Sequence, residues 1–239
     1  MQIVFHIGGH LTDDGLILKA LRTRADELAR LGILVPEPAA YRPVLRDTLV
    51  ALKGKLATEE IQDVVLDTIL GEEDGHRVIF SSDNFICTPQ VIFEGGTFYS
   101  KMAHKATWLR NLFPDFDVEF CLGMRDPATL VPALFQRQNG EPPGFPDWAR
   151  KIELTTLSWY RVLSDLSQAV PDVPITAWCN EDTPLIWPDV LRALTEATED
   201  DMIFEDDMTL IETLMSPTGL ARMTAYFEEN PPRGDTQRR

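Results

Sequence analysis

The chain has 239 residues, of which 44% are hydrophobic and 25% charged, and its formal net charge is -16 at pH 7. These proportions predict an ordinary globular protein with one sizeable core. The negative charge argues against nucleic acid and membrane surfaces as partners, because Lys and Arg side chains supply most of the attraction to their phosphates. A small molecule or another protein is therefore the expected partner, and the sequence leaves the oligomeric state open.

The cysteines and the first residues of the chain indicate a cellular compartment. Cys87, Cys121 and Cys179 are widely spaced and stand in or beside apolar runs, as free thiols do in a reducing compartment. The first ten residues lack the basic and apolar segments of a signal peptide, and no run approaches the roughly 20 apolar residues that span a bilayer. We therefore expect a cytoplasmic protein.

Hydrophobic periodicity predicts strands that alternate with helices along the chain. Residues 2–7 form a β-branched and aromatic run that is followed by two glycines, which predicts a buried parallel strand. Apolar residues at helical spacing then predict a helix from residue 13 or 14 to residue 31, stopped by Gly32. The later predictions are an extended segment over 33–36, helices over 42–53 and 58–70, a strand over 77–82, a helix over 99–111, a strand over 117–124 and a helix over 129–138. After a Pro-rich loop over 141–146 follow a helix over 148–169, a strand over 174–179, and helices over 187–198 and 217–228.

Two residues add local detail to these helices. Thr58 opens the helix over 58–70 with two acidic residues after it, which predicts that Thr58 caps this helix. Pro132 is compatible with the helix over 129–138 only in its first turn, because a proline further along would lack the N–H of a helical hydrogen bond.

Strands separated by helices of this length predict an α/β fold with a parallel central sheet flanked by helices, because parallel neighbours need crossover connections. We expect one domain over residues 1–229, helical from about residue 185, and a polar tail over 230–239 that is a frayed or truncated end. Such sheets bind ligands beyond the carboxyl ends of their strands. The segments of most interest are therefore residues 10–15, 81–84, 125–126 and 180–182.

Three segments at these strand ends resemble the sulfotransferase family, whose members move a sulfuryl group from 3′-phosphoadenosine 5′-phosphosulfate (PAPS) to a hydroxyl or amine. Residues 5–15, with residues 31–36 after the helix, are similar to the bacterial family's opening Gly-x-His-Lys-Thr-Gly-Thr-Thr and later Gly-Ile-x-x-Pro. Residues 78–83 are similar to the family's strand ending in Ser-Ser-Glu, and residues 122–127 to its strand ending in Arg-x-Pro. The resemblance implies a P-loop sulfotransferase-like three-layer sandwich.

The segment that resembles the phosphate-binding loop lacks the charges that hold a phosphate. The family's loop surrounds the phosphosulfate with backbone N–H groups of a helix N-terminus, a Lys and hydroxyls. Leu11 stands at the Lys position, and Asp13 and Asp14 stand where the phosphate would lie. Like charges about 4 Å apart repel by about 4 kcal/mol at an effective dielectric near 20. Arg125, which would grip the 3′-phosphate, is retained, but Ala133 replaces the Ser expected to share it.

The resemblance implies roles for residues at these strand ends. The candidate catalytic residues are His10, which can act as an acid or base near neutral pH, and Asp83, which stands at the place of an acceptor-activating Glu. The candidate cofactor-binding residues are Gly8, Gly9, Thr12, Gly15 and Arg125. No residue is assigned to a metal. No cofactor is predicted for an inactive protein, and PAPS is predicted for an active one.

Structural alternatives stand beside these roles. His10 can be a packed, hydrogen-bonded residue, Asp83 can belong to a turn, and the two acidic residues after Thr12 can cap the following helix. A solvated helix face explains the basic residues Lys101, His104, Lys105 and Arg110. Core packing explains Trp148, Trp159, Trp178 and Trp187.

Three functions are consistent with the sequence. The first is a sulfotransferase-like protein that has lost ordinary PAPS binding and acts as a binding or scaffold domain. The second is an active sulfotransferase with a remodelled loop, in which Arg125 and the basic helix residues hold the nucleotide. The third is a hydrolase-like Mg²⁺ site, because carboxylates are the ligands that hard cations prefer. Its ligands would come from Asp13, Asp14, Asp83, Asp126, Glu181 and Asp182.

Overall fold

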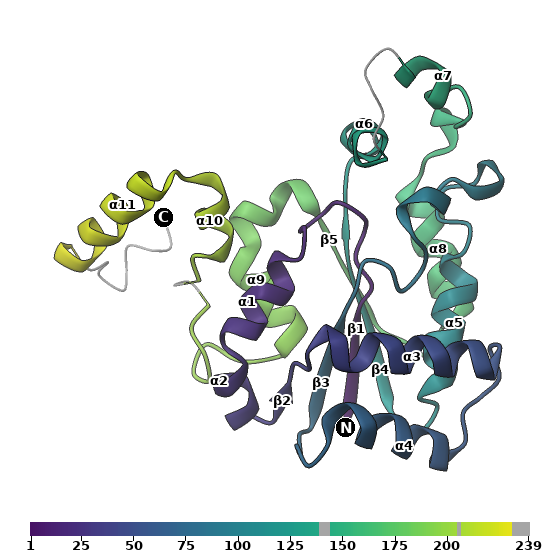
Figure 1. The fold of residues 1–239 in the computed structure, drawn as a ribbon, viewed down its shortest axis with the longest axis horizontal. Coiled ribbons are helices and arrows are strands. Elements are labelled where there is room, and N and C mark those ends of the chain that lie inside the picture. The colour runs from purple at the N-terminus through teal and green to yellow at the C-terminus, as the bar shows by residue number, and fades with distance from the viewer. Residues whose placement is uncertain (139–143, 205–206, 231–239) are drawn as a thin grey trace.

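The computed structural model describes residues 1–138, 144–204 and 207–230, and its centre is a parallel sheet of five strands in the order β2-β3-β1-β4-β5 (Figure 1). The predicted α/β class with a parallel central sheet is therefore confirmed. The strands are β1 (Gln2–His6), β2 (Ile33–Leu34), β3 (Arg77–Ser81), β4 (Asp117–Met124) and β5 (Ile175–Cys179). The two-residue strand β2 is a fifth strand, added to the four predicted ones at the edge of the sheet. Residues 33–36 were predicted to have an extended backbone but were not assigned to the sheet.

The helix predicted up to residue 31 is broken in two. It forms α1 (Leu16–Thr23) and α2 (Ala25–Arg30), and the backbone of Arg24 between them has φ and ψ of -111° and 20°. Neither Gly nor Pro marks this break in the sequence. The Arg24 guanidinium instead contacts the carbonyl of Ile203, far away in the chain, so tertiary contacts accompany the break.

The helices between β2 and β4 agree with the prediction. They are α3 (Pro38–Leu52), α4 (Glu59–Leu70) and α5 (Met102–Leu112), with short 3-10 turns η1 (Pro89–Val91) and η2 (Glu94–Gly96) before α5. The capping role predicted for Thr58 is confirmed, because its Oγ1 accepts a hydrogen bond from the N–H of Ile61 at 3.4 Å.

The segment after β4 departs most from the prediction. The single helix expected over 148–169 is wrong, because α7 (Phe145–Ala149), η4 (Leu154–Thr156) and α8 (Trp159–Ala169) replace it. Ser158 begins α8 by accepting the Arg161 N–H. Pro132 lies inside α6 (Pro127–Arg137) and beyond its first turn, because Asp126 caps the helix two residues earlier than expected. Part of the Pro-rich loop over 141–146 lies outside the described residues.

The C-terminal part is helical, as predicted. It contains η5 (Asn180–Asp182), α9 (Thr183–Thr195), α10 (Thr209–Leu214) and α11 (Pro217–Glu229), and the last two helices lie at the edge of the molecule (Figure 1). Of the tail predicted over 230–239, residues 231–239 lie outside the described residues. The extent of the domain over residues 1–229 stays a prediction.

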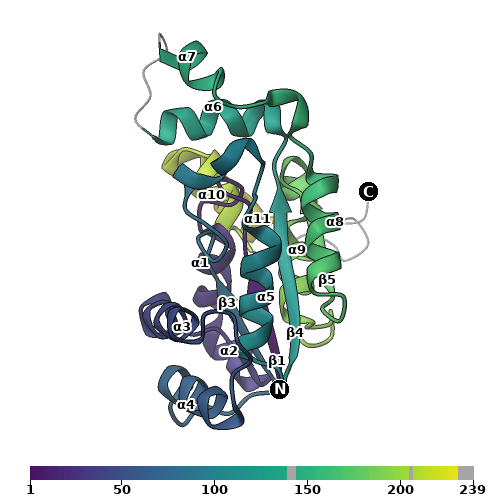
Figure 2. The ribbon, with the colours of Figure 1, turned by 90° about the vertical axis from the view of Figure 1, so that its right-hand side faces the viewer.

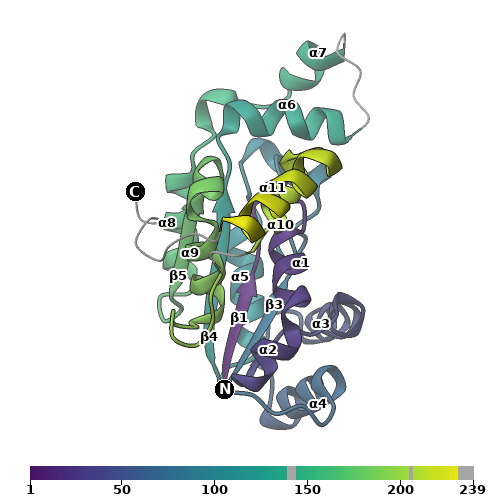
Figure 3. The same cartoon turned by 90° about the vertical axis from the view of Figure 1, so that its left-hand side faces the viewer.

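The sheet separates two apolar cores, so the molecule has three layers. Alternate strand residues point to opposite faces: Phe5 packs under the layer of α3, α4, α5 and α8, whereas Val4 packs under α1, α2 and α9. Figure 2 shows the molecule from the side of the first layer of helices, and Figure 3 shows it from the side of the second. The predicted core packing of the tryptophans is confirmed, because Trp178 and Trp187 are buried and Trp148 and Trp159 pack against the first core.

The cysteines are free thiols, as predicted, and two of the three, Cys87 and Cys121, are buried. Burial raises the pKa of Cys87 to about 11 and raises the pKa of Cys121 as well. In the part of the chain that the structure describes, every helix is too short or too polar to cross a lipid bilayer.

Candidate functional site

A pocket of about 370 Å³ lies where β1 and β3 end, and we call it the β1–β3 pocket. The chain leaves β1 toward one face of the sheet and β3 toward the other, which is the arrangement at which parallel sheets bind ligands. The predicted site residues His10, Asp83 and Gly15 line this pocket. The other lining residues are His6, Leu11, Asp13, Asp14, Leu18, Arg42, Ser81, Ser82, Pro89 and Arg137.

Glycines allow the loop between β1 and α1 to pack closely against its neighbours. A Cβ atom on Gly8 would lie 2.9 Å from the backbone after β3, and one on Gly9 would lie 2.3 Å from the carbonyl oxygen of Gly123. Thr12 Oγ1 donates a hydrogen bond to the Gly9 carbonyl at 2.7 Å, and Gly15 ends the loop with a φ of 83°. These residues shape the loop through contacts within the chain, and their role in cofactor binding stays a prediction.

His10 is buried and its ring is hydrogen-bonded at both nitrogens. Nε2 lies 3.0 Å from the carbonyl oxygen of Cys87, which can only accept, so Nε2 carries the proton. Nδ1 therefore accepts from the Tyr99 hydroxyl at 2.9 Å, and the same hydroxyl accepts the His10 backbone N–H at 2.9 Å. Burial lowers the pKa of His10 and raises the pKa of Tyr99. The hydrogen bonds of His10 thus agree with the alternative of a packed structural residue, and its catalytic role stays a prediction.

His6 and Ser81 form a second polar pair in the β1–β3 pocket, which sequence reasoning missed. They are register partners on β1 and β3, and His6 Nδ1 lies 2.8 Å from Ser81 Oγ. His6 Nε2 is buried without a hydrogen-bond partner. Burial lowers the pKa of His6, and the carboxylates of Asp13 and Asp83 oppose this shift. The only signal in the sequence was a polar residue at the end of an apolar strand.

Asp13, which stands in the segment that resembles a phosphate-binding loop, bonds to the start of α1. Its Oδ2 accepts the backbone N–H of Ile17 at 3.1 Å, in the first turn of α1. This confirms the capping role expected of Asp13, which stabilises a helix start by about 0.5 to 2 kcal/mol. Asp14 is exposed, has a positive φ of 47°, and makes no side-chain hydrogen bond that would cap the helix at Gly15.

Arg125 binds the loop itself and does not line the β1–β3 pocket. Its Nη1 donates to the carbonyl of Leu11 at 2.7 Å, and its Nε donates to Thr129 Oγ1 at 3.1 Å. Its own carbonyl accepts the indole N–H of Trp159 at 2.7 Å. The structure therefore does not bring Arg125 together with His10 and Asp83.

Two arginines in the β1–β3 pocket were not found from the sequence. Arg42 comes from α3, and Arg137 is the last residue of α6. Arg42 reaches the carbonyl of Ser81 at 3.4 Å. Neither residue belongs to a motif or follows a strand, so only the packing of α3 and α6 around the strand ends brings them here.

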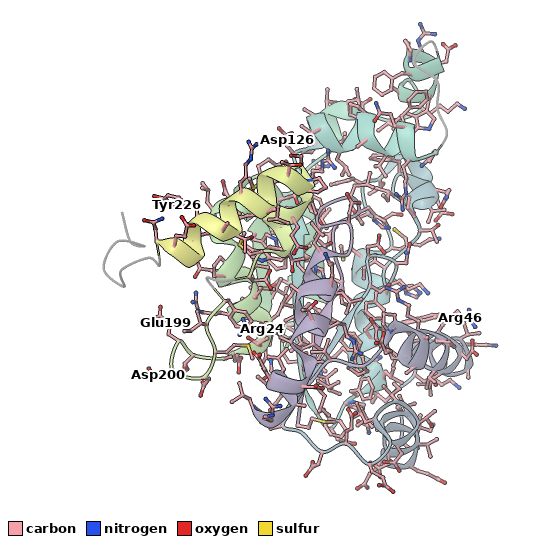
Figure 4. The ribbon with its side chains drawn as sticks, turned by 60° about the vertical axis from the view of Figure 1, so that its left-hand side comes forward. Arg24, Arg46, Asp126, Glu199, Asp200 and Tyr226 are labelled. Carbon is pink, nitrogen blue, oxygen red and sulfur yellow. The ribbon has the colours of Figure 1, made fainter. Side chains whose placement is uncertain are left out.

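The carboxylates at the other strand ends cap local backbone instead of converging. Asp126 Oδ1 accepts the Ala128 N–H at 2.8 Å at the start of α6 (Figure 4), and Glu181 Oε1 accepts the Asp126 N–H at 2.9 Å. Among the described residues, no group of three or more His, Cys, Asp or Glu side chains could hold a metal ion. In that part of the chain, the Mg²⁺ alternative has no set of ligands.

Comparisons with known proteins add one distant likeness. No family model and no curated protein matches the chain. Among solved structures, a sulfotransferase from Alicyclobacillus acidocaldarius is similar, with 13% sequence identity, a TM-score of 0.46, and coverage of 95% of this chain and 91% of that chain. A likeness at this level assigns neither an activity nor a ligand to this chain.

The two buried histidines should make stability depend on pH. Burial lowers the pKa of both His6 and His10 from 6.5, a value to which they return on unfolding. As the pH falls below about 6.5, the unfolded chain therefore binds protons that the folded chain does not. We expect the free energy of unfolding to fall between about pH 7.5 and pH 5.5, by at most about 1.4 kcal/mol per pH unit for each histidine. Urea unfolding at several pH values measures this, and constant stability over the range would contradict it.

Proposed function

We propose that this chain is a sulfotransferase-like binding domain that has lost ordinary PAPS binding. The observation that carries the proposal is the hydrogen bond from the Ile17 N–H to the Asp13 carboxylate at 3.1 Å. A bound phosphate needs such N–H groups at a helix N-terminus, together with the positive end of the helix dipole. An anion of the chain already uses both, and Leu11 supplies no cation beside it.

The contacts of Arg125 support the same proposal. Its guanidinium already donates to the carbonyl of Leu11 and to Thr129, at 2.7 and 3.1 Å. A nucleotide phosphate would have to displace these bonds and would approach a loop that carries two carboxylates. The bond of Arg125 to Leu11 ties the loop to the end of β4, which is a structural use of a residue that the family resemblance assigns to the 3′-phosphate.

The β1–β3 pocket supports the binding role, because its walls carry both charges. Asp13, Asp14 and Asp83 line it together with Arg42 and Arg137. A small molecule or a protein segment with both anionic and cationic groups would find side chains of opposite charge for both. We therefore propose that the ligand of this domain carries both kinds of charge.

An active sulfotransferase is the second candidate function, and one observation favours it. Arg42 and Arg137 line the same pocket as His10 and Asp83, and they supply the kind of positive charge that the loop lacks. In this alternative the arginines would hold the nucleotide and His10 or Asp83 would activate the acceptor, with PAPS as the cofactor.

Calorimetric titration with 3′-phosphoadenosine 5′-phosphate separates the two candidates. We expect no binding heat from the protein, even at ligand concentrations on the order of 1 mM. A Kd of about 1 mM corresponds to a binding free energy of about -4.1 kcal/mol, so any binding must be weaker than this. The double variant Asp13→Asn/Asp14→Asn keeps the side-chain shapes and removes two negative charges. It is expected to bind more tightly than the parent, because the repulsion is removed.

Micromolar binding by the unaltered protein would overturn the proposal. If that binding is lost in both Arg42→Ala and Arg137→Ala, the active sulfotransferase becomes the better description. If it is lost in Arg125→Ala alone, the nucleotide has displaced the bond to Leu11. Arg150→Ala is the matched control, because Arg150 is exposed on the surface and pairs locally with Asp147.

A further inference from the structure

A second groove, of about 580 Å³, lies beside the β1–β3 pocket, and we call it the α3–α5 groove. It lies between α3, α5 and the segment after β3, and it shares Arg42 and Ser82 with the first pocket. Most of its exposed lining is apolar. The apolar lining residues that matter most here are Leu45, Leu49, Val50, Phe85, Val91 and Trp108.

The charges of this groove are opposite to those of the chain as a whole. The chain has 38 acidic and 22 basic residues, yet the lining of the groove contains no Asp or Glu. Its charged lining residues are Arg42, Arg46, Lys101 and Lys105. Arg46 extends outward from α3 (Figure 4) and pairs with Asp47 at 2.9 Å. A groove with an apolar floor and a cationic rim favours a ligand with an apolar body and an anionic end.

Lys101, which directly precedes α5, and Lys105, which lies within it, differ in how their charge is balanced. Lys101 pairs with Glu94 at 2.6 Å. Lys105 has no carboxylate partner within the described residues, and its Nζ lies 4.1 Å from the ring centre of Trp108. Burial, together with the charge of Lys101, lowers the pKa of Lys105. An anion bound beside these two lysines would therefore reduce the repulsion between their charges and give Lys105 a partner of opposite charge.

We propose that the α3–α5 groove binds a free, single-chain amphiphilic anion such as a medium-chain carboxylate. The head group would meet Lys101, Lys105 and Arg42, and the alkyl chain would cover the apolar floor. The groove has the size of a small-molecule site. A membrane surface is disfavoured as the source of the ligand, because a net charge of -16 repels anionic lipid.

This inference goes beyond the proposed function and does not depend on it. The groove lies outside the loop between β1 and α1, and its ligand requires no nucleotide. Nucleotide binding would overturn the proposal for the loop but would leave this proposal intact, and failure of amphiphile binding would leave the proposal for the loop intact.

The experiment is calorimetric titration of the full chain with decanoate below its micelle concentration. Decyltrimethylammonium carries a tail of similar length with the opposite charge, and acetate carries the head group alone. We expect saturable one-to-one binding of decanoate, and no saturable binding of the other two. Phosphatidylserine vesicles test the membrane as a source, and we expect no co-sedimentation with them.

Three variants locate the site. Lys105→Gln removes the charge but keeps the length of the side chain, and it should weaken decanoate binding by about fivefold, as expected for about 1 kcal/mol. Val50→Asp places a negative charge among the apolar lining residues and should abolish binding; Val50 is 61% exposed, so the fold should tolerate the change. Lys151→Gln makes the same change of charge at an exposed residue outside the groove, and should bind as the parent does.

Several results would overturn the proposal. Equal binding of decanoate and decyltrimethylammonium would show that charge does not select the ligand. Equal weakening by Lys105→Gln and Lys151→Gln would show that the effect is that of net charge alone. Binding to phosphatidylserine vesicles in the absence of decanoate binding would identify a lipid surface as the partner.

Discussion

Replacing Glu119 by alanine is expected to lower the free energy of unfolding by about 3 kcal/mol or more. Glu119 Oε2 lies 2.9 Å from Nη2 of Arg77, and the two side chains are 9% and 0% exposed. Removing the carboxylate leaves the Arg77 guanidinium buried beneath α9, where the carbonyl of Leu194 accepts from its Nε at 2.8 Å. Arg77 keeps one partner, the exposed carboxylate of Glu196 at 3.0 Å from its Nη1, but its Nη2 loses the buried carboxylate and water cannot replace that bond.

Two comparisons test this explanation by denaturant unfolding. The double variant Arg77→Met/Glu119→Leu removes both charges and should recover most of the lost stability, since apolar side chains of similar size often replace a buried ion pair without cost. Asp172→Ala breaks the more exposed pair of Asp172 with Arg110, whose atoms are 2.7 Å apart, and should cost less than about 1 kcal/mol. Equal losses from Glu119→Ala and Asp172→Ala would contradict the role of burial.

Replacing Gly9 by alanine is expected to cost about 2 to 3 kcal/mol and to displace the loop between β1 and α1. The new Cβ atom would lie 2.3 Å from the carbonyl oxygen of Gly123, a backbone atom within β4 that cannot rotate away. It would also approach Thr12 Cγ2 at 3.3 Å and Trp159 Cη2 at 3.4 Å. Circular dichroism during urea unfolding measures the stability of the variant.

Two further glycines separate this clash from other effects of a methyl group. Gly15→Ala meets no atom within 4 Å but has a φ of 83°, so it should cost only the backbone strain of about 1 to 2 kcal/mol. Gly144→Ala makes an ordinary contact of 3.7 Å with the Phe135 ring, and should change stability by less than about 0.5 kcal/mol. A loss in Gly144→Ala as large as that in Gly9→Ala would show that the close approach to β4 is not the cause.

The sequence by itself determined the strands and most of the helices. The predicted strand over 117–124 matches β4, and the predicted helix over 58–70 differs from α4 only in that Thr58 is its cap. These features are encoded locally, by apolar periodicity and by the side chain that satisfies the first N–H groups of a helix. For the same reason the capping role of Asp13 could be expected before its hydrogen bond to Ile17 was seen.

The tertiary structure decided which side chains meet. Arg42 and Arg137 come to the β1–β3 pocket because α3 and α6 pack around the strand ends. Arg77 on β3 meets Glu119 on β4 because the strand order places only β1 between them, and the two long side chains reach across it. The break between α1 and α2 at Arg24 likewise has no local signal. Contacts of this kind join residues far apart in the chain, and they depend on strand order and helix packing. The hydrophobic periodicity of a single segment carries no information about either.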